Sequence, residues 1–140
     1  MKMDYSYALT PLLAWLVAGC LKFVINSVKA GQLAFGLIGY GGLPSNHSAI
    51  VSSTAALIAF KEGIGHPAFG VALTLAFIVM LDANSLRRQV GKQAAAINKL
   101  AAGQADMELL RERMGHTRVE IIAGVIVGVS VAAAANVFLH

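Results

Sequence analysis

Two histidines in this sequence lie where an apolar segment begins, among glycine and small polar residues. His47 follows the stretch 41–46 and stands just before the apolar segment 48–60. A helix that begins here presents free N–H groups to an anion such as phosphate. Ser45 or Asn46 could cap this helix, and Ser45 is also a candidate phosphate ligand. His47 could then protonate a departing oxygen. The alternative is a capped helix start at which the histidine only makes a hydrogen bond.

His116 stands four residues before Glu120, so both side chains fall on one face of a helix. The carboxylate could hold one ring nitrogen protonated and leave the other free as a nucleophile or base. Glu120 is an ionisable group at the start of an apolar segment, where such groups are costly without a partner or a function. The alternative is a histidine and a glutamate that face water at the membrane boundary.

Several basic residues could bind phosphate oxygens beside these histidines. Arg87 and Arg88 follow the third apolar segment, their planar guanidinium groups match phosphate oxygens, and Asp82 could orient one of them. Lys22 lies inside the first apolar segment, where it must reach the surface or meet an anion, and Lys29 follows it. The alternative is that the two arginines only set the membrane topology. Together these groups suit phosphoryl transfer, and no cluster of carboxylates or cysteines has the spacing of a metal site.

Membrane helices must position these residues. Of 140 residues, 57% are hydrophobic and 13% are charged, against about 25% charged in a soluble domain. A single cysteine, Cys20, excludes an intrachain disulfide. We therefore predict an all-α integral membrane bundle in a single domain, 1–140. Its four transmembrane segments are expected at about 8–28, 48–60, 67–81 and 119–139, with Gly63 ending the second and Pro67 starting the third.

Four crossings place the loops 29–47 and 82–118 on one side, and both termini and the 61–66 turn on the other. Seven of the eleven basic residues fall between Arg87 and Arg118. Because cytoplasmic loops carry an excess of Lys and Arg, we expect that shared side to be the cytoplasmic face of a bacterial inner membrane. No aromatic side chains interleave with these charges, so nucleic acid is not an expected partner.

Three further features concern the loops and the last helix. Residues 86–100 predict an amphipathic helix at or near the cytoplasmic membrane surface, followed by a second short helical run from Asp106 to Met114. The glycine-rich stretch 31–42 is expected to be a re-entrant or surface loop. Gly124 and Gly128 form a small-residue face that could pack against another helix of the chain or make a homo-oligomer.

Three strings carry a resemblance to a known family. Residues 41–49 read Gly-Gly-Leu-Pro-Ser-Asn-His-Ser-Ala, residues 82–94 read Asp-Ala-Asn-Ser-Leu-Arg-Arg-Gln-Val-Gly-Lys-Gln-Ala, and residues 115–120 read Gly-His-Thr-Arg-Val-Glu. In this order, from about Lys22 to Val129, the chain resembles the divergent family of small membrane proteins related to type 2 phosphatidic acid phosphatases. The resemblance implies a membrane phosphatase that acts on a phosphorylated lipid.

The resemblance also implies roles for the histidines. The parent superfamily has a Pro-Ser-Gly-His motif, which residues 44–47 match with His47 as the general acid. The end of its Ser-Arg-x5-His-x3-Asp motif matches His116 as nucleophile and Glu120 as the carboxylate that orients it. Arg111 stands five rather than six residues before His116 and follows no serine.

The first superfamily motif, Lys-x6-Arg-Pro, is matched in spacing only. Lys22 and Lys29 have that spacing, but Lys29 stands where the motif has arginine and Ala30 where it has proline. The family's own Asp-Ala-x3-Arg-Arg signature includes Arg87 and Arg88, which are expected to bind phosphate in place of the missing arginines.

The mechanism expected from these roles needs no metal and no cofactor. His116 attacks phosphorus in line and forms a phosphohistidine, while His47 protonates the leaving alkoxide; water then hydrolyses the intermediate with His47 as base. A cytoplasmic membrane face favours conversion of phosphatidylglycerophosphate to phosphatidylglycerol, with phosphatidic acid and prenyl (pyro)phosphates as alternative substrates. A different class of function is a non-catalytic membrane protein that binds or transports phosphorylated lipids.

Overall fold

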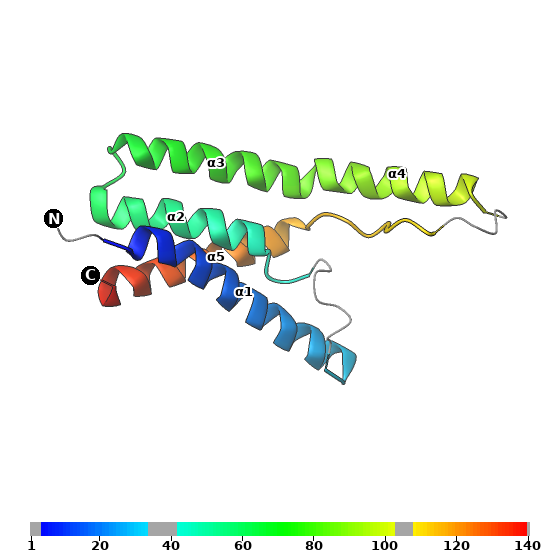
Figure 1. Cartoon of the computed structure of the whole chain (residues 1–140), viewed down its shortest axis with the longest axis horizontal. Coiled ribbons are helices and arrows are strands. Elements are labelled where there is room, and N and C mark those ends of the chain that lie inside the picture. Colours follow the sequence, from blue (N-terminus) through cyan, green and yellow to red (C-terminus); the bar gives the residue numbers. More distant parts are fainter. Residues whose placement is uncertain (1–3, 34–41, 103–107, 140) are drawn as a thin grey trace.

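The computed structural model describes residues 4–33, 42–102 and 108–139, and its regular elements in these ranges are five helices (Figure 1). The predicted all-α fold is confirmed, and a helix forms at each of the four apolar segments and at 86–100. The bounds are α1 Ser6–Ala30, α2 Asn46–Glu62, α3 Pro67–Asn84, α4 Leu86–Leu100 and α5 Arg118–Phe138.

The turn between α2 and α3 follows local backbone chemistry. Gly63 ends α2 with a φ of +87°, in the left-handed region that favours glycine. Pro67 opens α3 at a position where its missing N–H costs nothing, and Nδ1 of His66 accepts a hydrogen bond from the amide of Ala68 at 3.2 Å. The predicted helix stop and helix start are therefore both confirmed.

Helix α2 lies at the centre of the bundle, packed most extensively against α5 and also against α1 and α3 (Figure 1). Gly124 and Gly128 of α5 face α2, and a Cβ at Gly128 would collide with the carbonyl of Ala49 and the hydroxyl of Ser52. Small residues let two helices approach this closely. Of the two predicted uses of this face, packing against another helix of the same chain is the one observed.

In the described ranges, three helical stretches are long and apolar enough to cross a membrane: Ser6–Ala30, Pro67–Leu100 and Arg118–Phe138. Large apolar side chains such as Trp15, Phe77 and Ile126 point outward from these stretches. Such a surface suits lipid, which solvates apolar side chains as well as a protein core does. Helix α2 is not one of these three stretches. It has 17 residues, includes several serines, and is shielded from lipid by α1, α3 and α5.

Helix α4 continues the direction of α3 and extends away from the rest of the bundle (Figure 1). The two helices meet at Ser85, whose hydroxyl donates to the carbonyl of Leu81 at 2.7 Å. Pro67–Leu100 thus forms one long apolar-to-amphipathic stretch. The amphipathic helix expected at 86–100 is present, as an extension of a spanning helix.

The segment after α4 is where the prediction fails. We predicted a short helix from Asp106 to Met114. For the described residues 108–114 this prediction is wrong, because they are extended and non-helical. The side chain of Asn98 donates to the carbonyl of Leu110 and accepts from its amide, both at 2.8 Å. These bonds satisfy the backbone groups that a helix would have paired internally. The loop prediction for 31–42 falls mostly on residues 34–41, outside the described residues.

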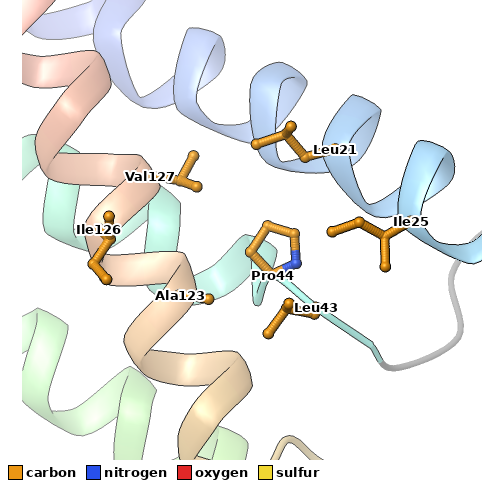
Figure 2. Close-up of a pocket in the computed structure, with 7 residues that line it drawn as sticks. All are labelled: Leu21, Ile25, Leu43, Pro44, Ala123, Ile126 and Val127. Carbon is orange, nitrogen blue, oxygen red and sulfur yellow. The ribbon is translucent and has the colours of Figure 1, made fainter.

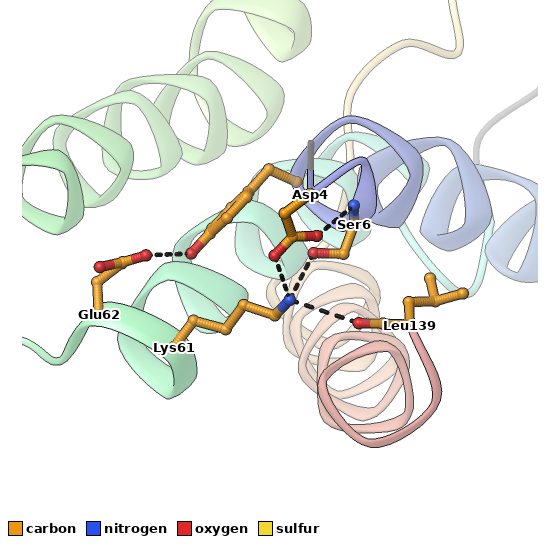
Figure 3. A network of polar contacts seen from close by, with 6 residues as sticks. Asp4, Ser6, Lys61, Glu62 and Leu139 are labelled. Atoms are coloured by element: carbon orange, nitrogen blue, oxygen red, sulfur yellow. Dashed lines mark hydrogen bonds and ion pairs between the residues drawn. The ribbon is translucent and has the colours of Figure 1, made fainter. Parts of the chain in front are cut away.

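A polar cluster, here called the terminal clasp, joins the two chain ends to the α2–α3 turn (Figure 3). It consists of Asp4, Ser6, Tyr7, Lys61, Glu62 and the carbonyl of Leu139. The Lys61 ammonium donates to Oδ2 of Asp4 at 2.6 Å, to Oγ of Ser6 at 2.8 Å and to the Leu139 carbonyl at 3.4 Å. Hydrogen bonds from Lys61 and Ser6 hold the pKa of Asp4 well below its usual range. The predicted grouping of both termini with this turn is confirmed.

We expect Lys61→Met to lower the midpoint of thermal unfolding in detergent by several degrees. The Lys61 side chain is only 13% exposed. Its loss leaves the Asp4 carboxylate and the Leu139 carbonyl without the hydrogen-bond donor that they share. Lys92→Met is the matched control, because Lys92 is exposed on α4 and no hydrogen bond or ion pair joins it to another described residue. Equal midpoints for the two variants would contradict a stabilising clasp.

Candidate functional site

The last helix begins at a capping box that also holds a histidine. The hydroxyl of Thr117 accepts from the amide of Glu120 at 3.3 Å, and Oε2 of Glu120 accepts from the amide of Thr117 at 2.9 Å. The same Oε2 lies 3.1 Å from Nδ1 of His116. One carboxylate therefore both closes the helix start and orients the imidazole ring.

The surroundings of His116 favour its neutral ring with the proton on Nδ1. An ionised carboxylate only accepts hydrogen bonds, so Nδ1 donates to Glu120, and Nε2 of the neutral ring keeps its lone pair. Burial lowers the pKa of His116, the hydrogen bond to Glu120 opposes this, and the charge of Lys22 lowers the pKa further. The His116 amide donates to the carbonyl of Ala83 at 2.9 Å, which ties this turn to the end of α3.

His47, in the first turn of α2, lies beside His116. The two ring centroids are 6.2 Å apart, with the rings tilted by 55°. Arg87 of α4 places Nη2 3.3 Å from Nε2 of His47 and donates from Nε to Oδ2 of Asp82 at 3.1 Å. Arginine only donates, so Nε2 of His47 accepts, and its buried Nδ1 has no hydrogen-bond partner among the described residues. We call these residues the histidine cluster: His47, Asp82, Arg87, His116 and Glu120.

Ser45 connects the starts of α2 and α5. It is fully buried, and its hydroxyl accepts from the amide of Ser48 at 3.4 Å and from the hydroxyl of Ser48 at 3.0 Å. Its own amide donates to the carbonyl of Glu120 at 2.9 Å. The predicted helix cap at Ser45 is confirmed, and phosphate binding by Ser45 stays a prediction.

The predicted phosphate-binding cations are placed unequally. Lys22, half-buried on α1, is close enough for its charge to act on His116. Arg88 packs its side-chain stem against the turn at Gly115, whose φ is +89°. Lys29 is exposed at the end of α1, and no hydrogen bond or ion pair within the described residues joins it to either histidine. The structure therefore gathers Lys22 and Arg87 and leaves Lys29 apart.

Comparison with known proteins identifies the family. The model of the divergent PAP2 family matches residues 4–131. The chain belongs to the divergent PAP2 family. The uncharacterized membrane protein YuiD of Bacillus subtilis (strain 168) is 31% identical to it, over 86% of this chain and 87% of that protein. No solved structure matches the chain. The resemblance seen in the sequence is confirmed, and this divergent PAP2 protein is a membrane protein.

Two asparagines of this divergent PAP2 protein were not predicted as site residues, although Asn46 was a candidate helix cap. Asn46 directly precedes His47, and Asn84 follows Asp82 by two residues; each has a buried Oδ1 with no hydrogen-bond partner among the described residues. Buried polar atoms are normally paired, and because Oδ1 only accepts hydrogen bonds, each of these atoms is suited to a group that donates one rather than to a phosphate oxygen. Their position inside the motifs at 41–49 and 82–94 was the signal that could have found them.

The side chains at the histidine cluster of this divergent PAP2 protein that could bind a ligand are a guanidinium group and two imidazoles. In residues 4–33, 42–102 and 108–139, no three His, Cys, Asp or Glu side chains lie where they could hold a metal ion together. The acidic groups at the histidine cluster are engaged with Arg87 and His116 instead. This arrangement can bind an anion, hold one imidazole as a base or nucleophile, and bring a second imidazole to the same anion.

Proposed function

We propose that this protein is a membrane phosphatase that hydrolyses a lipid phosphomonoester through a phosphohistidine on His116. The observation that carries the proposal is the contact between Glu120 and His116. The centroid of the His116 ring lies 6.2 Å from that of the His47 ring, and Arg87 contacts His47. At this separation one tetrahedral phosphate group can contact both rings. The carboxylate fixes Nδ1 of His116 as the donor, so Nε2 is the atom that attacks.

The proposed reaction has two steps. Nε2 of His116 forms a bond to phosphorus while the bond from phosphorus to the lipid oxygen breaks, and His47 gives a proton to that oxygen so that an alcohol leaves. Water then attacks the phosphohistidine, His47 accepts a proton from it, and inorganic phosphate leaves with His116 restored. His116 is then unmodified, and His47 again carries the proton that it gave up in the first step.

Arg87 links substrate binding to the protonation of His47 in this proposal. Without substrate its guanidinium donates to Nε2 of His47, which keeps a proton off that atom. A phosphate group forms stronger, charge-assisted bonds with arginine and would draw Arg87 away. Nε2 can then hold the proton that the leaving group needs, while Lys22 and Arg88 help to neutralise the phosphate oxygens.

The substrate is proposed to be phosphatidylglycerophosphate, converted to phosphatidylglycerol at the cytoplasmic face of a bacterial inner membrane. Support for a lipid comes from the apolar helices and from the relation to PAP2 proteins. Support for the cytoplasmic face comes from the basic residues, of which seven of eleven fall between Arg87 and Arg118.

Phosphate release in detergent, with EDTA present, tests this proposal on phosphatidylglycerophosphate, phosphatidic acid and a prenyl phosphate. We expect the purified protein to release phosphate from the first substrate fastest and to be insensitive to EDTA. His66→Ala is the matched control, because His66 lies in the turn at the opposite end of α2. Loss of activity with EDTA would overturn the metal-free mechanism. Binding without turnover would favour a lipid-binding membrane protein over a phosphatase.

A further inference from the structure

An apolar pocket lies between α1 and α5, beside the chain that leads into α2 (Figure 2). Its volume is about 240 Å³, and apolar residues line it. Leu21 and Ile25 of α1 and Val127 of α5 form its sides, with Leu43 and Pro44 pointing in between them (Figure 2). The pocket opens to the surface, where Leu21 is exposed. An open pocket with such walls offers nothing to a polar ligand and suits a hydrocarbon group.

The pocket and the histidine cluster are built on the same three segments. Leu21 directly precedes Lys22 on α1, and Pro44 stands three residues before His47. Ala123 also lines the pocket and lies one helical turn after Glu120 on α5. A ligand with a phosphate at the cluster and a hydrocarbon chain beside it would therefore span adjoining surfaces.

We infer that this pocket holds one fatty acyl chain of the lipid whose phosphate is bound at the histidine cluster, an assignment that rests on the proposed function. Both long walls belong to helices that are apolar enough to cross a membrane, so an acyl chain reaches the pocket without passing through water. The small side chain of Ala123 leaves the space open. Ala123 is therefore a specificity-determining position for chain length.

Filling the pocket tests this assignment. Ala123→Phe is expected to lower kcat/KM for dipalmitoyl phosphatidic acid about tenfold, and to leave kcat/KM for glycerol 3-phosphate within about twofold. Dihexanoyl phosphatidic acid should be affected less than the dipalmitoyl lipid. The matched control is Ala133→Phe, because Ala133 is exposed on the same helix, ten residues further along. An equal loss on all three substrates, or no loss on any, would overturn the pocket assignment.

A photocrosslinking experiment tests the occupant without requiring catalysis. Phosphatidic acid with a diazirine in its acyl chain is bound to His116→Ala protein in detergent and irradiated, and the labelled peptides are identified by mass spectrometry. Labels on the peptides of Leu21 and Val127, competed by unlabelled dipalmitoyl phosphatidic acid and lost in Ala123→Phe, support the assignment. Labels spread over the outward face of α3 would overturn it.

The two experiments separate this inference from the proposed function. If wild-type protein releases no phosphate from any substrate but the pocket peptides are labelled, the phosphatase proposal fails and the acyl site stands. If phosphate is released but labelling misses the pocket, the acyl site fails alone. Labelling by a prenyl phosphate probe in place of the acyl probe, or crosslinks from this face to a second copy of the chain, would also overturn the acyl assignment.

Discussion

His116→Ala is expected to reduce phosphate release from the preferred lipid by about a thousandfold or more. The variant lacks the nitrogen that forms the bond to phosphorus, so only the positioning and electrostatic contributions of the remaining residues survive. The measurement is the initial rate of phosphate release in detergent, with a phosphoenzyme trapped from the wild type and absent from the variant. His116 is 7% exposed, so the thermal midpoint must be recorded beside the rate.

Glu120→Gln serves as the graded companion of that variant. Glutamine still fits a capping box, so the start of α5 should persist. The neutral amide can no longer stabilise a positively charged ring, so the rate should fall by less than it does in His116→Ala. Full activity in His116→Ala would disprove the nucleophile assignment, whereas full activity in Glu120→Gln would disprove only the orienting role.

Gly128→Leu is expected to destabilise the bundle by about 3 kcal/mol or more, the upper end of overpacking effects. A Cβ at Gly128 already collides with the Ala49 carbonyl and the Ser52 hydroxyl, and it lies 3.0 Å from the amide nitrogen of Ser53. Most of these are backbone or short side-chain atoms that cannot swing aside. Helices α2 and α5 would have to separate, which also moves His47 relative to His116.

Thermal unfolding in detergent and the yield of monodisperse protein measure this effect. Gly70→Leu is the control, because a Cβ at Gly70 on α3 meets no atom within 4 Å. That variant should match or slightly exceed the wild type, since leucine is a better helix former than glycine. If the two leucine variants unfold at the same temperature, the close approach of α2 and α5 is not what holds the bundle together.

The helices could be predicted because their causes are local. Apolar length marks the spanning segments, and residues such as Gly63 and Pro67 mark their ends by their own backbone preferences. The segment 108–114 could not be predicted in the same way. Its extended form depends on Asn98, which is more than ten residues away and supplies hydrogen bonds that no local pattern reveals.

In the candidate site, too, contacts between residues close in the sequence could be predicted, whereas contacts that depend on helix packing could not. Spacing predicted the contact between Glu120 and His116, and the structure has it at 3.1 Å. The predicted reason is wrong, because His116 precedes α5 and meets Glu120 at the capping box rather than on a helical face. Topology predicted that His47 and Arg87 reach the same face, but not that they touch, because their contact depends on α4 continuing the line of α3. The burial of Ser45 against the carbonyl of Glu120 also depends on how closely α2 and α5 pack.

The length of α2 between the histidine cluster and the terminal clasp affects how a lipid headgroup can reach the site. His47 and Lys61 are fourteen residues apart, which at about 1.5 Å per residue is a helical rise of ~21 Å. The hydrocarbon core of a typical bilayer is about 30 Å thick. Helix α2 is therefore shorter than this core, while α1, α3 and α5, which cover its sides, belong to stretches long enough to span it. With the terminal clasp at one membrane surface, the histidine cluster lies below the other, so a lipid headgroup would have to descend between the helices to reach it.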